Sequence, residues 1–498
     1  MIKLFPDKIF RLQIITVIFF SIVYSLLSLV NHYNFRTYAY DLGLMNNALR
    51  DYAHFRFNNC TLIQPELKNY LSVHFEIFIM LLSPFCYIFG TYTLLVFQII
   101  AVLFGGFGIY KYIREISSNE KISFLAQLHF YFFYGIFSAL SFDFHNNVLG
   151  AMFVPWFFYF FHLKKWKWAA LFFIFQISTK ENMPLWMVFV CAGISLLYWK
   201  DKTQRLVSIF YCLSSIIYFV FVVKFVMPAL ANQQESYGQI RDSYTAVGSS
   251  LSEIITTFFT KPIYIVKLLF LNHAGNPFGD YCKMETYLFC LLSGGILFFI
   301  RPQFFIMLVP IFAQKMFHND YLKWGIGAHY SIEFAPICTL GAFYVITKLQ
   351  NEKWKIYTAT VITSLALAMT IRSFDQSITY FDRDSHRIYK EWHYKRNYDV
   401  AEAHRALKLI PDEAKVSAQS PFVSHLSFRD YIYQFPFINN AEYVIFSYAD
   451  YTYPLSKESF EVQITMLMSS DKWEKVYDKN QMVILKKKSG FGVESFER

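Results

Sequence analysis

Apolar residues gather in eleven runs along the chain, each close to the length of a membrane-crossing helix. The runs lie near residues 11–30, 92–112, 122–140, 147–163, 168–180, 183–199, 206–228, 284–300, 303–318, 329–348 and 355–371. A helix needs about 20 mainly apolar residues to cross a hydrocarbon core roughly 30 Å thick. The pattern therefore predicts a mostly α-helical, polytopic membrane bundle with about eleven transmembrane helices.

Composition supports a membrane protein and gives no sign of a nucleic-acid partner. The 498 residues are 55% hydrophobic and only 16% charged, whereas a soluble chain carries roughly 25% charged residues. The net charge of +10 is accounted for by the excess of Lys and Arg in cytoplasmic loops, and no nucleic-acid motif is present. The N-terminal "MIKLFPDKIFRLQIITVIFF" has no small-residue cleavage site, so we expect a retained anchor.

Charge placement predicts the topology. The segment 71–89 is apolar but carries His74, Glu76 and Pro84. If it lies along or dips into the outer interface without crossing, the short Lys- and Arg-rich loops all fall on the cytoplasmic side with the N-terminus. If it crosses, every one of these loops falls outside, against the rule. We therefore predict a cytoplasmic N-terminus in the inner (plasma) membrane of a prokaryote, with two long outer loops, 31–91 and 229–283.

The chain divides into two predicted domains, a membrane domain at 1–372 and a soluble extracytoplasmic α/β domain at 373–498. In the second, "KVSAQS", "EYVIFSY", "WEKVYD" and "QMVILKKK" read as short strands. Helices are expected in "YDVAEAHRALKLI" and near 455–468. In the outer loop 229–283, "LSEIITTFFTKPIYIVKLLF" suggests an amphipathic interfacial helix. The seven Cys show no metal-binding spacing, and pairing of Cys60 with Cys282 is left open.

Polar residues collect at the outer ends of the predicted spans. The motifs are "YDLGLMNNALRDYAH", "VHFE", "SFDFHNN", "STKENMP" and "HNDYLKWGIGAHY", and they supply Asp41, His74, Glu76, Asp143, His145, Lys180, Glu181, His329 and Tyr330. Ionisable groups at membrane depth are costly and tend to be functional. Several separate loops that contribute acids, His and Lys to one face of the bundle therefore predict a functional site there.

Structural roles for the same residues stay open. Leu42, Met45, Leu49 and Tyr52 would share one face of a helix lying on the membrane, and Asp41 would then stand at its N-cap. Asp143 and His145 could satisfy one another within a tight turn. Lys180 could extend its ammonium group to the interface, with the adjacent Glu181 pointing elsewhere. His329 and Tyr330 could be interfacial aromatic residues.

Two resemblances follow from these motifs. Through "YDLGLMNNALRDYAH", "VHFEIFIMLLSPFCYIFG", "FDFHNNVLGAMFVPW", "STKENMPLWM", "HYSIEFAPI" and "IPDEAKVSAQSPFVSHLSFRDYIYQFP", the chain resembles a family of predicted prokaryotic membrane proteins catalogued only as a domain of unknown function. More distantly, its layout resembles the C-type (GT-C) glycosyltransferases, which use polyprenyl-phosphate sugars. That superfamily has a catalytic acid in a first outer loop of interfacial helices, a place that Asp41 occupies. His74 and Asp143 match its further polar positions, whereas the paired acids common in the superfamily are missing beside Asp41.

The second resemblance implies transfer of a sugar from a polyprenyl-phosphate donor to a glycan, lipid or protein acceptor at the outer membrane face. Asp41 would be the general base, with Asp143 and His74 as further catalytic residues. Lys180 and Arg36 are nominated for the donor phosphate. The remaining substrate contacts are assigned to His145, Glu181, His329 and Tyr330. Asp41, His74 and Glu76 would suit Mg²⁺ or Mn²⁺, although the need for a metal is left open.

Two other classes of function compete with this one. A transporter or flippase for lipid-linked saccharides would be expected to show internal repeats and ionisable groups near the bilayer midplane. No repeat is visible, and the charged groups lie at span ends. A non-enzymatic membrane protein could instead use the outer α/β domain to bind a partner, which would leave the polar loops incidental.

Overall fold

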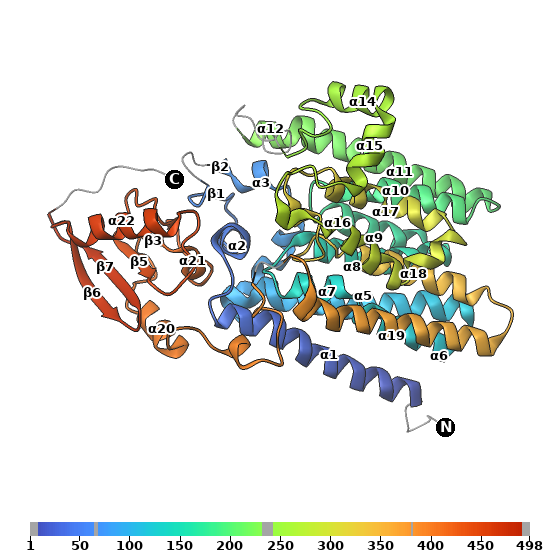
Figure 1. Cartoon of the computed structure of the whole chain (residues 1–498), viewed down its shortest axis with the longest axis horizontal. Helices are drawn as coiled ribbons and strands as arrows, with labels where there is room; N and C mark the ends of the chain where they lie inside the picture. Colours follow the sequence, from blue (N-terminus) through green and yellow to red (C-terminus); the bar gives the residue numbers. More distant parts are fainter. Residues whose placement is uncertain (1–7, 64–67, 232–242, 380–381, 491–498) are drawn as a thin grey trace.

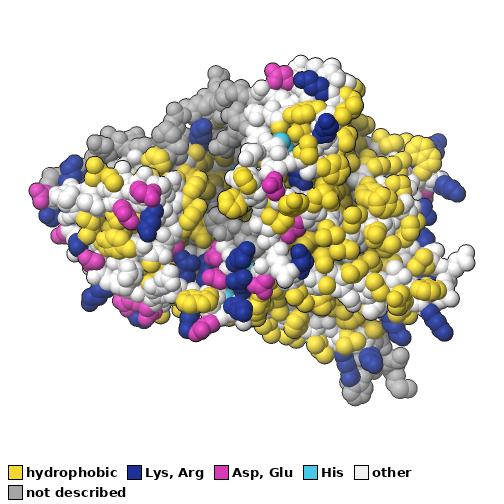
Figure 2. Space-filling view, viewed as in Figure 1, with side chains coloured by type: hydrophobic (Ala, Val, Ile, Leu, Met, Phe, Trp, Pro, Cys, Tyr) yellow, Lys and Arg dark blue, Asp and Glu magenta, His cyan; other side chains and the backbone are white. Residues whose placement is uncertain are grey.

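The fold is mostly helical, with a small sheet domain near the C-terminus. The computed structural model describes residues 8–63, 68–231, 243–379 and 382–490. Figure 1 shows a bundle of long helices with the sheet domain, coloured red, beyond one end of it. Apolar side chains cover the bundle half of the face in Figure 2, and Lys and Arg lie at its far edge.

Each of the eleven predicted apolar runs contains helix. The elements are α1 (Lys8–Tyr33), α5 (Thr93–Ser117), α6 (Glu120–Tyr131) with α7 (Tyr134–Leu140), α8 (Asn146–His162), α9 (Trp166–Ile177), α10 (Met183–Leu197), α11 (Lys202–Phe221) with η4 (Val222–Val226) and α12 (Met227–Leu230), α16 (Cys282–Leu292) with η6 (Gly295–Phe299), α17 (Gln303–Met316), α18 (Phe334–Thr347) and α19 (Glu352–Gln376). Their pairwise packing buries a continuous apolar core.

Length and composition qualify fewer helices as membrane spans. Within the described ranges four helical segments are long and apolar enough to cross a membrane, or five if α6 and α7, bent by 41°, form one span. These four are Lys8–Tyr33, Ile77–Ser117, Lys202–Leu230 and Glu352–Gln376. Helices α9, α10, α17 and α18 are apolar but shorter. A membrane protein with several spans is thus supported, and the count of eleven stays a prediction.

The basic turns lie together at the end of the bundle away from the sheet domain. Asn119 begins α6 by accepting hydrogen bonds from the N–H groups of Lys121 and Ile122, and its amide donates to Glu352 at the start of α19 (3.2 Å). Lys164 likewise pairs with Asp201, 2.6 Å away, which caps α11. These links join turns that the sequence assigned to one side of the membrane, as expected for alternating helices.

The first long loop forms a set of short elements at the opposite end. They are η1 (Ala39–Gly43), α2 (Leu44–Ala53), β1 (Asn59–Cys60), β2 (Lys68–Asn69), α3 (Tyr70–Val73), η2 (Ile77–Phe85), α4 (Cys86–Phe89) and η3 (Gly90–Tyr92). The ambiguous segment 71–89 is therefore broken helix. Gly90, with φ +55°, ends α4 in a conformation that favours glycine, and α5 begins three residues later.

The second long loop also departs from one regular helix. "LSEIITTFFTKPIYIVKLLF" forms α14 (Leu251–Thr260) and α15 (Pro262–Phe270), separated at Lys261 because Pro262 has no N–H group to continue the first helix. The two short 3-10 turns nearby are η5 (Pro277–Gly279) and η7 (Tyr321–Lys323). All seven cysteines are free. Cys60 and Cys282 therefore do not pair in this structure.

The C-terminal domain confirms the strands expected from the sequence. Its sheet has the order β4-β3-β5-β7-β6, with a parallel half around β3 and an antiparallel half around β7. The elements are η8 (Glu391–Tyr394), α20 (Val400–Leu407), β3 (Val416–Ala418), α21 (Ser420–Leu426), β4 (Ile432–Gln434), β5 (Tyr443–Ser447), α22 (Lys457–Met468), β6 (Trp473–Lys479) and β7 (Met482–Lys487). Helix α19 continues to Gln376, four residues beyond the predicted boundary at 372.

The sheet domain is docked on the first loop through α21, an element that the sequence did not predict. Gly43 of η1 lies so close to α21 that a Cβ atom there would be 2.9 Å from Val423 Cγ1. Asn47 of α2 donates to the carbonyl oxygens of Ser427 and Arg429, each at 2.9 Å. Helix α2 was expected on the membrane surface. It is instead buried between η2 and the sheet domain, because its polar face satisfies backbone groups of that domain.

Candidate functional site

Five polar turns from distant parts of the chain converge at the sheet-domain end of the bundle. Tyr38 donates its backbone N–H to Asp143, which joins the first loop to the turn before α8 (2.9 Å). Phe78 donates to the carbonyl of Ser178, which joins the loop to the turn after α9. Asn147 at the start of α8 donates to Glu333 before α18 (2.9 Å). The predicted convergence of these turns is therefore present in the fold.

Asp41 lies inside a π-helical turn and does not cap a helix. Element η1 begins at Ala39, so Tyr38 holds the N-cap position. The Tyr38 side chain makes no capping hydrogen bond to the backbone of η1. Distant residues accept the first two N–H groups: Asp143 binds that of Tyr38, and Ser420 Oγ of α21 binds that of Ala39 (3.2 Å). The N-cap interpretation of Asp41 is therefore wrong, and its carboxylate is available for another contact. Single π turns inside helices are frequent at functional sites.

The Asp41 carboxylate makes this contact with His145, as a hydrogen bond. His145 Nε2 lies 3.2 Å from Asp41 Oδ1. The imidazole is buried, whereas the Asp41 side chain keeps 31% of its surface exposed. Of the two groups the carboxylate is thus the one that a ligand can reach. The ring of His145 also stacks on that of His329, with centroids 3.4 Å apart, which holds its plane fixed.

One buried side chain of α5 fixes the turn that carries Asp143 and His145. Gln98 accepts from the backbone N–H of His145 (3.0 Å) and donates to the carbonyl of Asp143 (3.1 Å). Asp143 itself has φ +48°, a conformation that few non-glycine residues adopt. One sequence interpretation had Asp143 and His145 hydrogen-bonded to each other. The structure shows instead that each has a different partner. Each binds a different part of η1.

The two carboxyl groups have pKa values that move in opposite directions. Burial opposes ionisation of Asp41, but the hydrogen bond from His145 and the charges of Lys323 and Lys180 lower the pKa of Asp41 below its ordinary value. Burial, and then the charge of Asp41, raise the pKa of Asp143 well above its ordinary value. Burial lowers the pKa of His145. Near pH 7 the arrangement is thus an ionised Asp41 that accepts from the Nε2–H of a neutral imidazole.

A second group of charges lies beside the first. Lys180 Nζ is 3.6 Å from Glu76 Oε1, and Glu76 is fully buried, where it also accepts from Asn146 (2.6 Å) and Tyr70. The adjacent Glu181 turns the other way. It lies 3.4 Å from His74 Nδ1 and accepts from the N–H of Phe75, as expected for neighbours that point apart. Burial works to raise the pKa of Glu181, yet the His74 hydrogen bond and the Lys180 charge lower it to about 2.

The loop before α18 adds cations that the sequence analysis did not nominate. Lys323 Nζ lies 3.9 Å from the ring centroid of Tyr330 and contacts its hydroxyl. Burial lowers the pKa of Lys323 to about 8, against the charges of Asp320 and Asp41. Lys315 of α17 is buried and donates to the carbonyls of Gly325 (2.8 Å) and Tyr330 (3.1 Å). Lys315 thus shapes the loop, while Lys323 brings a cation toward Asp41.

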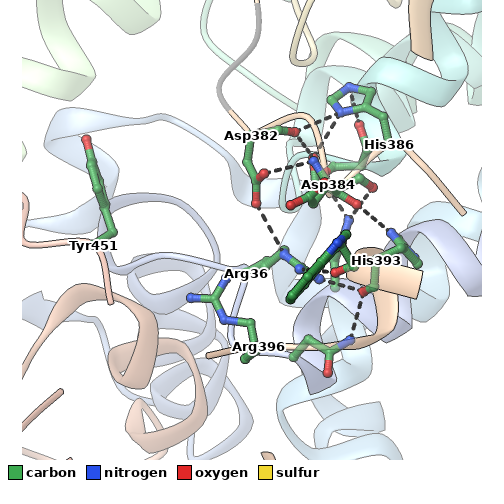
Figure 3. A network of polar contacts seen from close by, with 12 residues as sticks. Arg36, Asp382, Asp384, His386, His393, Arg396 and Tyr451 are labelled. Carbon is green, nitrogen blue, oxygen red and sulfur yellow. Dashed lines mark hydrogen bonds and ion pairs between the residues drawn. The ribbon is translucent and has the colours of Figure 1, made fainter. Parts of the chain in front are cut away.

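Arg36 lies in a different network, shown in Figure 3. Its guanidinium donates to the carbonyls of His393 (2.6 Å), Trp392 (2.7 Å) and Lys395 (3.0 Å), and pairs with Asp382 (3.2 Å). The structure therefore places this nominee for phosphate binding where it ties the end of α1 to the segment before the sheet domain. It does not bring Arg36 together with Lys180.

The residues considered for a metal do not form a suitable ligand set. Among the residues that the structure describes, no three His, Cys, Asp or Glu side chains come together as metal ligands. Asp41 bonds to His145, His74 bonds to Glu181, and Glu76 is occupied by Tyr70, Asn146 and Lys180. Asp41, His74 and Glu76 thus have separate partners, and no step through Mg²⁺ or Mn²⁺ is derived from them.

Gln98, Lys315 and Lys323 are the site residues that sequence reasoning missed. Gln98 and Lys315 each interrupt a strongly apolar run, and polar residues within such runs are costly unless they have partners inside the protein. That signal was present for both. Lys323 carries no comparable signal, because a lysine between two spans is equally compatible with a solvated loop.

These features define an integral membrane protein with several apolar helices and a polar site at the end that carries the sheet domain. The chain belongs to the family of predicted membrane proteins known as DUF2079, whose model matches residues 31–484. That range includes all five converging turns and nearly all of the sheet domain. No curated protein matches the chain.

Proposed function

We propose that this protein is a membrane glycosyltransferase that moves a sugar from a polyprenyl-phosphate carrier to an acceptor hydroxyl at the outer membrane face. The observation that carries the proposal is the Asp41–His145 pair: an accessible carboxylate with a lowered pKa, held by a buried neutral imidazole. A general base must be ionised at the working pH and within hydrogen-bond reach of the proton it removes. Asp41 meets the first condition and is open to a ligand.

Asp41 accepts the proton of the acceptor hydroxyl as the oxygen attacks the anomeric carbon. The bond between that carbon and the carrier phosphate breaks, and its electron pair leaves with the phosphate. Lys323 and Lys180 both act electrostatically on Asp41, and we assign to them the stabilisation of the charge that develops on the departing phosphate. His145, by fixing the carboxylate, is a positioning residue in this scheme, and so is Asp143, which holds the start of η1.

The surroundings suit a substrate that is part lipid and part saccharide. A groove of about 500 Å³ runs along α1, and its mainly apolar lining, which includes Ser21 and Ser25, ends at Tyr33 and Tyr92 near the site end of the bundle. An isoprenoid tail matches such a surface in chemistry. The Asp41 carboxylate keeps 31% of its side-chain surface exposed, so it offers a polar group that the saccharide part of the substrate can reach.

In the proposed topology, the site lies at the outer face, the basic turns lie in the cytoplasm, and eleven spans cross the inner membrane of a prokaryote. This topology is supported by the separation of the basic turns from the turns that form the site. Lys164 and Asn119 mark one end of the bundle, and Asp41 and His145 mark the other. Excess Lys and Arg is typical of the cytoplasmic side.

The two competing functions account less well for these contacts. A transporter of lipid-linked saccharides would place its ionisable groups near the midplane, whereas the Asp41 and Glu76 groups lie in turns at one end. A partner-binding protein would leave the pKa contrast between Asp41 and Asp143 without a role. Pairs of acids with separated pKa values are characteristic of acid–base sites.

The test is Asp41→Asn, which keeps the shape of the side chain and removes its basicity. Asp201→Asn is the matched control, because it makes the same chemical change at the basic end of the bundle. A strain lacking the protein is complemented with each form, and lipid-linked and surface glycans are compared at equal membrane abundance. We expect Asp201→Asn to restore the parental glycans and Asp41→Asn to leave the glycan defect of the deletion strain. Restoration by both variants would remove Asp41 as base, and an unchanged glycan profile in the deletion strain would remove the function itself.

A further inference from the structure

Exposed tyrosine rings extend from the Asp41 turn onto the outer domain. Tyr40 precedes Asp41 and is 37% exposed, and Tyr451 and Tyr453 of the loop after β5 are 45% and 46% exposed. The ring centroids of Tyr40 and Tyr453 lie 6.4 Å apart, and those of Tyr451 and Tyr453 lie 5.9 Å apart with their planes within 5°. The three rings, called the tyrosine platform below, thus form one cluster drawn from two domains.

The platform is built on a fixed support. Gln419, almost completely buried, donates to the carbonyl of Tyr451 (2.9 Å), and the buried Gln434 donates to that of Tyr453 (3.1 Å). Between the two tyrosines and the sheet, Asp450 pairs with Arg396 (2.6 Å). In Figure 3, Tyr451 stands apart from the network around Arg36, with its ring directed away from Arg36 and Arg396. Exposed aromatic rings on an anchored loop lose little further freedom when a ligand binds.

The platform is continuous with the proposed catalytic turn. Tyr38 donates its N–H to Asp143, and its ring packs edge-on against Tyr451 at 5.9 Å. Tyr40 and Asp41 are neighbours in η1. The rings of Tyr451 and Tyr453 therefore adjoin Tyr38 and Tyr40, the residues that lead into the turn carrying Asp41.

We propose that Tyr40, Tyr451 and Tyr453 seat the saccharide part of the acceptor and present one of its hydroxyl groups to Asp41. Sugars combine flat C–H faces with rim hydroxyls, and tyrosine offers the complement, a ring face and a phenolic hydroxyl. A lipid surface is the competing ligand, since tyrosines also collect at membrane interfaces. The sugar is favoured because the platform includes a loop of the sheet domain, beyond the end of the bundle (Figure 1), and adjoins the Asp450–Arg396 ion pair.

This inference rests on the proposed function, so its test measures binding apart from turnover. The full-length Asp41→Asn protein is placed in nanodiscs. The probe is the surface glycan of the deletion strain, released by mild acid and labelled with a fluorophore at its reducing end. We expect Tyr451→Ala and Tyr453→Ala each to weaken binding at least tenfold, and Tyr451→Phe to keep most of it. Tyr448→Ala is the matched control, since Tyr448 is 50% exposed on the same loop but its ring contacts Phe446.

The outcomes separate the two ideas. Two results would overturn the platform and leave the proposed function standing. In the first, the probe still binds when Tyr451→Ala and Tyr453→Ala are combined. In the second, the protein requires Asp41 for transfer but does not bind the probe. Quenching of the probe-free Tyr451→Trp protein by brominated lipids assigns the rings to the membrane and also overturns the platform. If glycan binding depends on the platform but Asp41→Asn still transfers sugar fully, the saccharide site is retained. Its assigned role, to present a hydroxyl group to Asp41, is then removed.

Discussion

Replacement of Gln98 by Leu tests whether the geometry of the site depends on one buried amide. Gln98 is fully buried in α5 and holds the Asp143–His145 turn by accepting from one backbone N–H and donating to one carbonyl. Leucine has a similar volume, so the change removes the two hydrogen bonds without opening a large cavity. Both backbone groups would then be buried without a partner.

The expected cost follows from those two groups. A buried donor or acceptor left without its partner costs about 1–3 kcal/mol, so Gln98→Leu should destabilise the protein by roughly 2–6 kcal/mol. The effect on catalysis should be larger than stability alone explains. His145 would no longer be fixed behind Asp41, and a misplacement of about 1 Å at a reacting group can lower the rate on the order of 100-fold.

Gln127→Leu provides the comparison. Gln127 is a fully buried glutamine of α6 that accepts from Gln13 (3.0 Å) and donates to Tyr131 (3.2 Å), far along the bundle from Asp41. Thermal unfolding of the detergent-solubilised proteins measures stability, and sugar transfer is measured per amount of folded protein. We expect both variants to lose stability and only Gln98→Leu to lose transfer. Equal transfer by the two variants at equal folded amounts would refute the bracing role of Gln98.

Three further outcomes follow from the structure. The pKa of Asp143 is raised in the folded protein. The neutral carboxyl group therefore contributes stability that is complete below about pH 3.9, the pKa in the unfolded chain, and is lost as pH rises through the raised pKa. In thermal unfolding, Asp143→Asn should become increasingly more stable than the parent as pH rises. Gly43→Ala should cost about 1–3 kcal/mol by overpacking against α21, and adding Val423→Ala should recover part of that loss in the same assay. Arg36→Gln should lower stability by about 3 kcal/mol or more, because three backbone carbonyls and Asp382 lose the guanidinium that binds them. This variant should leave the KM for the proposed lipid donor unchanged, whereas Lys323→Gln should raise that KM.

Local pattern was sufficient for most of the elements. Apolar runs located the bundle helices, and alternation in "EYVIFSY" and "QMVILKKK" located β5 and β7. Strand β4, only three residues long, and the seven-residue helix α21 were missed. The three-residue strand β3 was found within "KVSAQS", but neither β4 nor α21 stands in so clear a local pattern. Their stability comes from packing against η1 and the sheet, which no local window contains.

The same distinction explains what could be foreseen of the site. Polar turns at span ends indicated Asp41, His145 and Lys180, because any bundle with alternating helices brings such turns to one end. The partners within the site were not foreseeable. A hydrogen bond between Asp41 and His145 joins residues 104 positions apart, so it depends on how the bundle packs. The N-cap interpretation of Asp41 was wrong for the same reason, since Asp143 and Ser420 supply the backbone acceptors from elsewhere.

Those two borrowed acceptors also give the outer domain a part in the site. Ser420 and Asp143 take the first N–H groups of the Asp41 turn from opposite sides, one from α21 and one from the bundle. Neither domain alone therefore satisfies the backbone around Asp41. An orphaned N–H group costs about 1–3 kcal/mol, so the contact of Ala39 with Ser420 stabilises the turn that carries Asp41. The docking of α21, which Asn47 and Gly43 share, therefore contributes to the geometry on which the proposed chemistry depends.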